Sequence, residues 1–373
     1  MKTWPVRGIA LMQAFLFLAH WLIYRTLAVF CGNLGPARIQ ALGTALFLLA
    51  FSFIAASLLS FRYSNRLIRA IYKFAAVWLG FLNYFFCASC LCWIADLALL
   101  LSPLAPALPR YRPLIAGVLF ALAFAAGIYG LLNARWVRIR RLTVKLPNLP
   151  AAWRGRTALV ISDLHLGNVN GLGFARRIAA LAARLHPDII FLPGDIFDGV
   201  HADHVRLIAP FKKLTPPLGI YFSAGNHEEY GGEAHFTDVL TRIGIRVLAN
   251  EKADVEGLQI LGVPYGDSTY PIRLRATLEA LRLDPARPSI LLHHAPHRLP
   301  IVNESGVSLQ LSGHTHGGQI FPFTWFTRHA FGQFTYGLQQ FGALQVYTSS
   351  GAGTWGPPMR IGTHPEIVLL EFN

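Results

Sequence analysis

The chain has 373 residues, of which 53% are hydrophobic and only 14% are charged. Because a soluble globular protein carries roughly 25% charged residues, part of this chain is expected to lie in lipid. The formal net charge of +14 suggests a nucleic-acid binder, yet 15 of the 33 Lys and Arg precede Pro150 beside a single acid, whereas the remainder holds 18 bases and 18 acids. The excess positive charge therefore belongs to the apolar half, where basic loops meet lipid headgroups, and no nucleic-acid partner is expected.

Four long apolar stretches precede residue 135. Each reaches the roughly 20 residues that cross a hydrocarbon core as a helix, and a cleavable signal peptide could explain only the first. We therefore expect residues 1–135 to form a transmembrane domain with four helices, and the lipid bilayer to be a partner. The stretches are Gly8–Phe30, Ala41–Phe61, Phe74–Leu101 and Leu114–Ala134.

The basic residues that flank these stretches predict the direction in which the chain crosses the membrane. If the N-terminus is cytoplasmic, that side receives eleven Lys and Arg, and the opposite side receives at most four. Positive residues are retained on the cytoplasmic side, and four spans return the chain to its starting side. The sequence thus predicts a multi-pass protein of the inner (cytoplasmic) membrane whose polar half faces the cytoplasm. Asp96, the one acid at membrane depth, either has a functional role or snorkels to the boundary; we favour snorkelling.

From Thr157 onward the pattern changes to short β-rich runs, with a helical segment, Gly173–Leu185, between the first two. Strands with intervening helices imply an α/β layered domain. We assign residues 157–373 to this domain and residues 136–156 to a basic juxtamembrane linker. The expected strands are Ala158–Ser162, Asp188–Leu192, Gly219–Ala224, Leu258–Val263, Ser289–His293, Ser308–Leu311 and Gln345–Ser349.

Thirteen of the fourteen histidines follow residue 150, and most stand where a strand run stops. Residues i and i+2 of an extended strand share a face, so Asp163 and His165 can share a metal, as can His314 and His316 if that segment is extended. Such donors suit Mn, Fe or Zn, and the absence of thiolates argues against a structural zinc site. Five strand ends carry these groups: Asp163 with His165, Asp195, Asn226-His227-Glu228, His293 with His294, and His314 with His316.

The five pieces read SDLHLG, PGDIFDG, AGNHEEY, LLHHAP and SGHTHGGQ, and in this order they resemble the sequence blocks of the calcineurin-like metallophosphoesterase family. The resemblance covers roughly Ala158 to the C-terminus, including the stretch GTWGPPMRIGTHPEI, which is similar to one in the membrane-associated bacterial branch. It implies an α/β fold, a four-layer αββα metallophosphoesterase sandwich with its site at the strand C-termini, here preceded by a four-helix transmembrane domain.

Carried onto matching positions, the resemblance implies two divalent metal ions. The family pattern has its histidine two residues before a proline, which selects His294 over His293. One metal would be held by Asp163, His165, Asp195 and His316, and the other by Asp195, Asn226, His294 and His314, with Asp195 bridging the two.

This ligand set implies a dinuclear metal-dependent phosphoric ester hydrolase, in which a metal-bridging hydroxide attacks a phosphodiester or pyrophosphate bond. The family's histidine at the position of His227 contacts the scissile phosphate, so His227 is the expected catalytic residue and the candidate donor of a proton to the leaving group. Glu228 either orients His227 or is a surface residue. The aromatic stretch Phe321–Phe331 either borders the substrate pocket or packs in the core, and we favour the core.

A catalytic domain held at a membrane suits a lipid-linked phosphoester, with its phosphate in water and its acyl chains in lipid. One activity implied by the resemblance is that of a UDP-2,3-diacylglucosamine pyrophosphatase of lipid A synthesis; another is a broader phosphodiesterase or phosphatase acting on phospholipid-like or nucleotide substrates. An alternative of a different class is a membrane sensor with a vestigial phosphoesterase domain. Intact residues at every matched position argue against a vestigial domain.

The topology can be tested with a reporter enzyme fused after Asn373. We expect the reporter to be active in the cytoplasm, because eleven basic residues against four favour that side for the N-terminus and the four spans return the chain to it. Reporter activity on the far side of the membrane would show that the number of spans or the charge argument is wrong.

Overall fold

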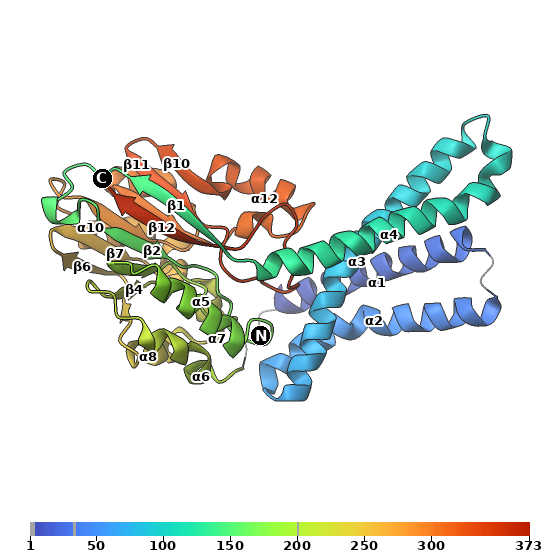
Figure 1. Cartoon of the computed structure of the whole chain (residues 1–373), viewed down its shortest axis with the longest axis horizontal. Helices are drawn as coiled ribbons and strands as arrows, with labels where there is room; N and C mark the ends of the chain where they lie inside the picture. The colour runs from blue at the N-terminus through green and yellow to red at the C-terminus, as the bar shows by residue number, and fades with distance from the viewer. Residues whose placement is uncertain (1–3, 33–34, 200) are drawn as a thin grey trace. The chain divides into compact units, whose positions relative to one another are not determined.

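The computed structural model describes residues 4–32, 35–199 and 201–373 (Figure 1). The chain divides into two units, one made of residues up to 132 with residues 356–359, and the other of residues 133–355 with residues 360–373. The first unit is helical, and the second holds every strand of the described chain.

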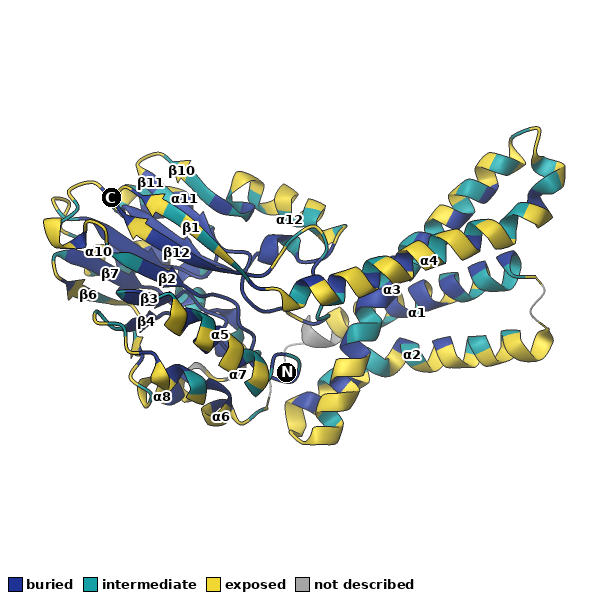
Figure 2. Ribbon diagram, viewed as in Figure 1, coloured by how far each residue is buried: buried dark blue, intermediate teal, exposed yellow. Residues whose placement is uncertain are grey.

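The helical unit contains four long helices, and each predicted apolar stretch lies in one of them, except that Leu101 follows the end of the third. All four are long and apolar enough to cross a membrane. A small core that includes Leu16, Leu46 and Leu82 joins the first three helices, whereas side chains such as Leu11 and Leu48 are 73% and 64% exposed. Figure 2 shows exposed positions along α2 and α4. Such outward apolar faces suit lipid. The helices are α1 (Trp4–Phe30), α2 (Pro36–Arg62), α3 (Arg66–Leu100) and α4 (Leu108–Arg135), with a 3-10 turn, η1 (Ala105–Ala107), before α4.

Asp96 of α3 is buried and forms a two-pronged ion pair with Arg112 of α4. Nε of Arg112 lies 2.7 Å from Oδ1 of Asp96, and Nη2 lies 2.9 Å from Oδ2. The prediction that Asp96 snorkels to the boundary is therefore wrong, because a cation on the next helix neutralises it inside the unit. Arg112 is one of the four basic residues counted on the side opposite the N-terminus, and its charge is neutralised by this ion pair.

The second unit contains two six-stranded sheets. The first has the order β1-β12-β2-β3-β4-β5, and the second has the order β10-β11-β9-β8-β7-β6. The strands of the first sheet, in that order, are Arg138–Val144, Glu366–Phe372, Thr157–Val160, Ile189–Leu192, Ile220–Phe222 and Arg246–Val247. Those of the second are Gly337–Phe341, Leu344–Thr348, Leu309–Ser312, Ser289–Leu292, Leu258–Gly262 and Glu251–Val255.

Helices connect the strands and cover the sheets. They are α5 (Leu172–Arg184), α6 (His204–Ile208), α7 (Asn226–Gly231), α8 (Glu233–Thr241), α9 (Tyr265–Thr269), α10 (Pro271–Ala280), α11 (Leu299–Glu304) and α12 (Phe323–Phe331). Four 3-10 turns, η2 (Ala151–Trp153), η3 (Ala209–Lys213), η4 (His316–Gly318) and η5 (Gly332–Thr335), complete the unit.

Successive residues of the central strands point into different cores, as the two-residue period of a strand requires. In β3, Ile189 and Phe191 pack between the sheets, whereas Ile190 and Leu192 pack under α5. A third core joins the outer face of the second sheet to α10 and α11. The layers therefore run helix, sheet, sheet, helix, which confirms the predicted αββα fold class.

Parallel pairing fixes where the connecting loops meet. β2, β3 and β4 are parallel neighbours in the first sheet, and β8 and β9 are parallel neighbours in the second. Because the carboxyl ends of parallel neighbours lie at one edge, the loops that leave them can converge on one site.

The predicted linker, residues 136–156, is wrong in part, because Arg138–Val144 is strand β1 and pairs in parallel with β12. The strand was hidden because two of its inward positions are arginines and not apolar residues. Arg140 donates to the hydroxyl of Tyr336, and that hydroxyl donates to Glu366 of β12 at 2.8 Å. A satisfied polar network thus takes the place of hydrophobic burial at this edge of the sheet.

The core between the sheets can be tested at Leu370 of β12, which is fully buried. We expect Leu370→Ala to destabilise the second unit by about 2–5 kcal/mol, because it removes packed methyl groups and leaves a cavity. The neighbouring variant Glu371→Ala is the control, since that side chain is exposed. Thermal unfolding of the full chain in detergent measures both, and equal shifts would contradict the two-sheet packing.

Candidate metal centre

The seven predicted ligands lie in loops that leave the carboxyl ends of β2, β3, β4, β8 and β9, and the structure brings them together. Asp163 and His165 follow β2, and Asp195 follows β3. Asn226 begins α7 after β4, His294 follows β8, and His314 and His316 follow β9. Residues up to 153 positions apart in the sequence thus become neighbours, because parallel strands of both sheets end at one place.

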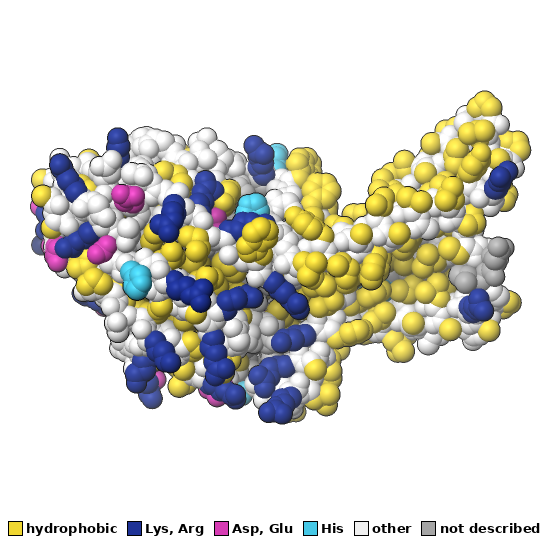
Figure 3. Space-filling view, viewed as in Figure 1, with side chains coloured by type: hydrophobic (Ala, Val, Ile, Leu, Met, Phe, Trp, Pro, Cys, Tyr) yellow, Lys and Arg dark blue, Asp and Glu magenta, His cyan; other side chains and the backbone are white. Residues whose placement is uncertain are grey.

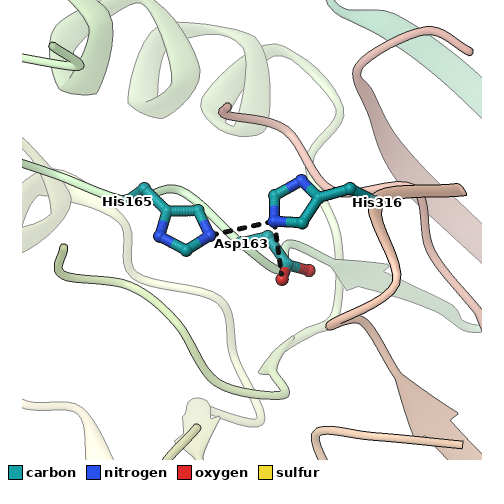
Figure 4. A group of neighbouring side chains, drawn as sticks. All are labelled: Asp163, His165 and His316. Atoms are coloured by element: carbon teal, nitrogen blue, oxygen red, sulfur yellow. Dashed lines mark hydrogen bonds and ion pairs between the residues drawn. The ribbon is translucent and has the colours of Figure 1, made fainter. Parts of the chain in front are cut away.

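Asp163, His165 and His316 form the first group of donor atoms (Figure 4). Nε2 of His316 lies 3.0 Å from Nε2 of His165 and 3.5 Å from Oδ1 of Asp163. Two imidazole nitrogens and a carboxylate oxygen therefore point at one another in a fully buried place, where their lone pairs repel unless a proton or a cation lies between them. This arrangement fits a divalent cation.

The second group contains His294, His314 and Asn226, and it meets the first group at Asp195. Nε2 of His294 lies 3.1 Å from Oδ2 of Asp195, and Nδ1 of His314 lies 2.9 Å from Oδ1 of Asn226. The same Oδ2 of Asp195 is 3.8 Å from Nε2 of His165. Asp195 is therefore the side chain that both groups share.

The backbone at these positions differs from the extended strand that the sequence pattern suggested. Both Asp163-x-His165 and His314-x-His316 lie beyond the ends of their strands, and all four residues have positive φ, between 46° and 68°. Asp195 is also left-handed, with φ of 54°. A non-glycine residue in this region is strained and persists where surrounding structure enforces it, most often at functional sites. The predicted residues are therefore neighbours, but a left-handed turn brings them together and not the alternation of an extended strand.

Glycines beside the two carboxylates allow this close packing. A Cβ on Gly313 would collide with the carboxylate of Asp163, and a Cβ on Gly225 would collide with that of Asp195. The glycine that precedes the histidine in SGHTHGGQ and the one that precedes the asparagine in AGNHEEY are thus required by space.

The buried carboxylates and imidazoles of the site shift one another's pKa values. Although burial raises the pKa of a carboxyl group, the imidazoles of His294 and His165 outweigh it and hold the pKa of Asp195 below its usual range. Burial together with the charge of Asp195 raises the pKa of Asp163. Burial lowers the pKa of His294, but Asp195 more than compensates and raises it to about 10. A cation at this place would compete with that proton.

His314 and His316 are uncharged at neutral pH. Burial and the neighbouring charge of His294 lower the pKa of His314 to about 3, and burial beside Arg360 lowers that of His316 well below its usual value. Neutral imidazole is the form that binds a metal.

Two of the histidines are oriented through their second ring nitrogen. Nδ1 of His294 donates to the carbonyl of Pro193 at 2.8 Å, and Nδ1 of His165 lies 3.4 Å from Oδ1 of Asp198. Such contacts leave Nε2 as the free ligand atom, which is the usual arrangement around a metal. His293, by contrast, packs against His297 with 4.9 Å between ring centres, and its ring nitrogens have no hydrogen-bond partner among the described residues.

Glu228 has neither of the roles considered from the sequence. It is fully buried, and its carboxylate accepts hydrogen bonds from the backbone N–H groups of Asp195, Phe197 and Gly225 at 2.8–3.0 Å. It therefore ties the loop after β3 to the loop after β4. Burial and the charge of Asp195 raise its pKa to about 7.

Asp198 is a residue of the site that the sequence analysis missed. Its backbone carbonyl lies 3.2 Å from Nδ1 of His227, and its Oδ1 lies 3.7 Å from the same atom. With its 3.4 Å contact to His165, Asp198 positions one predicted ligand and the predicted catalytic histidine. The available signal was the second acid of PGDIFDG, three residues after Asp195.

Arg360 is the second missed residue, and it is fully buried. Its guanidinium donates to the carbonyls of Ser350, Gly353 and His316 at 2.6–2.8 Å and lies 3.1 Å from Nδ1 of His316. The guanidinium thus contacts both the backbone carbonyl and the ring of His316, so it fixes the orientation of this imidazole. The orientation of His316 therefore depends on Arg360, which stands in the sequence stretch GPPMRIG.

The layered fold and the two joined groups of carboxylate and imidazole donors define a metal-dependent hydrolase with a dinuclear site. Comparison with known proteins agrees. A family model described as calcineurin-like phosphoesterase matches residues 156–318. A metallophosphoesterase of Aquifex aeolicus is 32% identical over 260 residues, which cover 68% of this chain and 98% of that protein.

Relatives with additional sequence are also found. A metallophosphoesterase of Campylobacter jejuni is 31% identical over 241 residues, which cover 63% of each chain. A transmembrane protein with a metallophosphoesterase domain from Danio rerio is 29% identical over 265 residues, which cover 66% of this chain and 60% of that protein. The match thus spans less than two thirds of these two relatives. The chain belongs to the calcineurin-like metallophosphoesterase family, and the resemblance seen in the sequence is confirmed.

The role of Arg360 can be tested with Arg360→Met, which keeps much of the side-chain volume and removes the donors. We expect metal affinity to fall about 10–100-fold, because losing a residue that orients a metal ligand has effects of this size. Arg141→Met, at an exposed position on β1, is the control. Metal titration of both purified variants measures the effect, and unchanged affinity in Arg360→Met would show that His316 does not need it.

Proposed function

We propose that this chain is a membrane-anchored phosphoesterase that hydrolyses a phosphodiester or pyrophosphate bond in a lipid-linked substrate. The observation that carries the proposal is the convergence of seven buried or nearly buried donor residues, shared through Asp195, in a chain with four membrane-spanning helices.

Within this proposal, each metal has its own ligands. Asp163, His165 and His316 would hold one cation together with Asp195. Asn226, His294 and His314 would hold the other, also with Asp195. The grouping is supported by the donor distances, which fall into the same two sets. Oxygen and nitrogen donors without thiolates suit Mn, Fe or Zn.

When bound, a pair of divalent cations supplies a nucleophile at neutral pH and positive charge against the phosphoryl oxygens. His227 is proposed to serve the leaving group. Because Nδ1 of His227 is held against Asp198, Nε2 is the nitrogen that remains to donate a proton. Burial and the nearby His165 lower the pKa of His227, so the ring needs the negative charge of a bound phosphate to keep its proton.

The surroundings of His227 bear on the substrate. The rings of Tyr230 and Trp355 lie 5.9 Å and 6.1 Å from the ring of His227, and these two side chains are 73% and 58% exposed. Exposed aromatic faces beside a reacting group can stack on a planar base. This favours, as a second candidate, a nucleotide-containing pyrophosphate such as UDP-2,3-diacylglucosamine.

We further propose that the catalytic unit faces the cytoplasm from the inner membrane. The basic residues before residue 146 support this orientation. The ion pair between Arg112 and Asp96 strengthens it, because it removes one free positive charge from the opposite side.

The proposal is tested by measuring turnover with the full chain in detergent, with Mn added, on lipid-linked and soluble phosphoesters and on UDP-2,3-diacylglucosamine. We expect Asp195→Asn to abolish hydrolysis and to release metal, because both groups of ligands lose their common member. Wild-type protein that binds no metal and hydrolyses none of these compounds would favour a sensor with a vestigial domain.

The role of His227 can be separated from that of the ligands by a pair of variants. We expect His227→Ala to retain metal and to lose about 10²–10⁴-fold in rate on an ester with a poor leaving group. The loss should shrink for a nitrophenyl ester, whose leaving group needs no proton. His294→Ala should instead lose metal and slow both esters alike.

Metal content and both rates are measured for each variant. Equal loss on both esters in His227→Ala would indicate phosphate binding in place of proton donation, and loss of metal in that variant would mean that the ligands are wrongly assigned.

A further inference from the structure

Helix α12 (Phe323–Phe331) is an aromatic segment on the surface of the second unit. None of its residues is buried, and Phe323, Trp325 and Phe326 are 51%, 64% and 55% exposed. The prediction that this stretch packs in the core is therefore wrong. Figure 3 shows hydrophobic side chains gathered where α12 lies in Figure 1, with basic side chains beside them.

The aromatic side chains of α12 form one surface. The ring of Phe326 lies 5.0 Å from that of Trp325 and 6.4 Å from that of Phe323, measured between ring centres. Arg328 and His329 occupy the last turn, and the helix contains no acid. His329 lies beside Trp325, with 6.4 Å between their ring centres. An exposed helix that is rich in Trp and Phe and carries basic residues is typical of segments that lie in the interface of a bilayer.

We propose that α12 lies in the lipid headgroup region of the membrane that the chain itself spans, with Phe323, Trp325 and Phe326 inserted among the acyl chains. A lipid surface is favoured over a protein partner because the connection between the units is short. α4 ends at Arg135 and β1 begins at Arg138, so only Trp136 and Val137 separate a membrane helix from the first strand.

The start of the second unit also pairs an exposed aromatic residue with a basic one. Trp136 is 69% exposed, and the guanidinium of Arg138 lies over its ring at 4.7 Å. Trp and Arg are enriched at the ends of membrane spans, where apolar rings and charged groups meet headgroups.

The position of α12 gives this contact a consequence for the metal centre. The helix follows the loop of His314 and His316, and the ring of Phe331 lies 6.2 Å from that of His314. Thr315, between the two histidines, donates to the carbonyl of Thr335, which follows the helix. Insertion of α12 would bring the bilayer surface to the rim of the centre, where a phosphoester attached to a lipid could enter without leaving the membrane.

The test uses the full chain in vesicles of phosphatidylcholine and phosphatidylglycerol and measures no activity. Cys31, Cys87, Cys90 and Cys92 are replaced by Ala, and a single cysteine is introduced by Ala330→Cys for labelling with a nitrobenzoxadiazole fluorophore. Ala330 is exposed and lies four residues after Phe326, on the same side of the helix. The control is Ile272→Cys on α10, a position that is 85% exposed in the same unit.

We expect lipids brominated on their acyl chains to quench the label at position 330 and not the label at position 272. The added substitutions Trp325→Ser and Phe326→Ser should abolish the quenching at position 330. They touch no proposed ligand, and unchanged metal content shows that the unit is still folded.

Three results would overturn the proposal. Equal quenching at both positions would indicate collision of the whole unit with lipid. Quenching that persists in the serine variant would mean that the aromatic side chains do not hold the helix in the membrane. A blue-shifted label at position 330 that brominated lipid cannot quench would mean that protein, such as a second copy of the chain, covers α12.

Discussion

Asp195 is the constraint on which the rest of the site depends. A carboxylate buried this deeply is tolerated only where cations or donors compensate its charge. Here two imidazoles approach its Oδ2 from loops that follow different strands, with Nε2 of His294 at 3.1 Å and Nε2 of His165 at 3.8 Å. The backbone N–H of His227 donates to Oδ1 of Asp195 at 3.0 Å. A side chain that must satisfy donors from both sheets fixes where the ends of those sheets meet.

Glu228 fixes the position of Asp195 through hydrogen bonds to the backbone. Its carboxylate accepts the backbone N–H of Asp195 and that of Gly225, so the loops after β3 and β4 cannot separate without leaving buried donors unpaired. The left-handed backbone at Asp163, His165, Asp195, His314 and His316 shows that these loops are strained. The hydrogen bonds of Glu228, Arg360 and the glycine contacts are what hold them in that strained form.

The catalytic unit and the membrane unit each contain a buried acid that is stabilised by hydrogen-bond donors. Asp96 in the membrane unit is neutralised by the two nitrogen atoms of Arg112, and Glu366 in the catalytic unit accepts from the hydroxyls of Tyr336 and Tyr347. In both places a buried acid is matched by donors of fixed geometry, so the polar group specifies one arrangement of its neighbours.

The sequence by itself determined the parts whose signal is local. Length and hydrophobicity predicted the four membrane helices, because an apolar run of about 20 residues has few other uses. Short β-rich runs, with a helix between the first two, predicted the layered α/β class, and glycine-flanked acids and histidines at the strand ends predicted where donor atoms gather. Strand β1 was missed because Arg138 and Arg140 occupy its inward positions. Tyr336, the partner of Arg140, is distant in the chain.

Only the tertiary structure decided the matters that depend on distant partners. It showed that Glu228 connects two loops and does not orient His227. It also added Asp198 and Arg360 to the site. It also placed the aromatic residues of α12 on the surface. A sequence pattern reports what each residue could do, but Arg360 and His316 stand 44 positions apart. Whether an aromatic run faces the core or the solvent likewise depends on which elements cover it. That information exists only once the two sheets have packed and their loops have met.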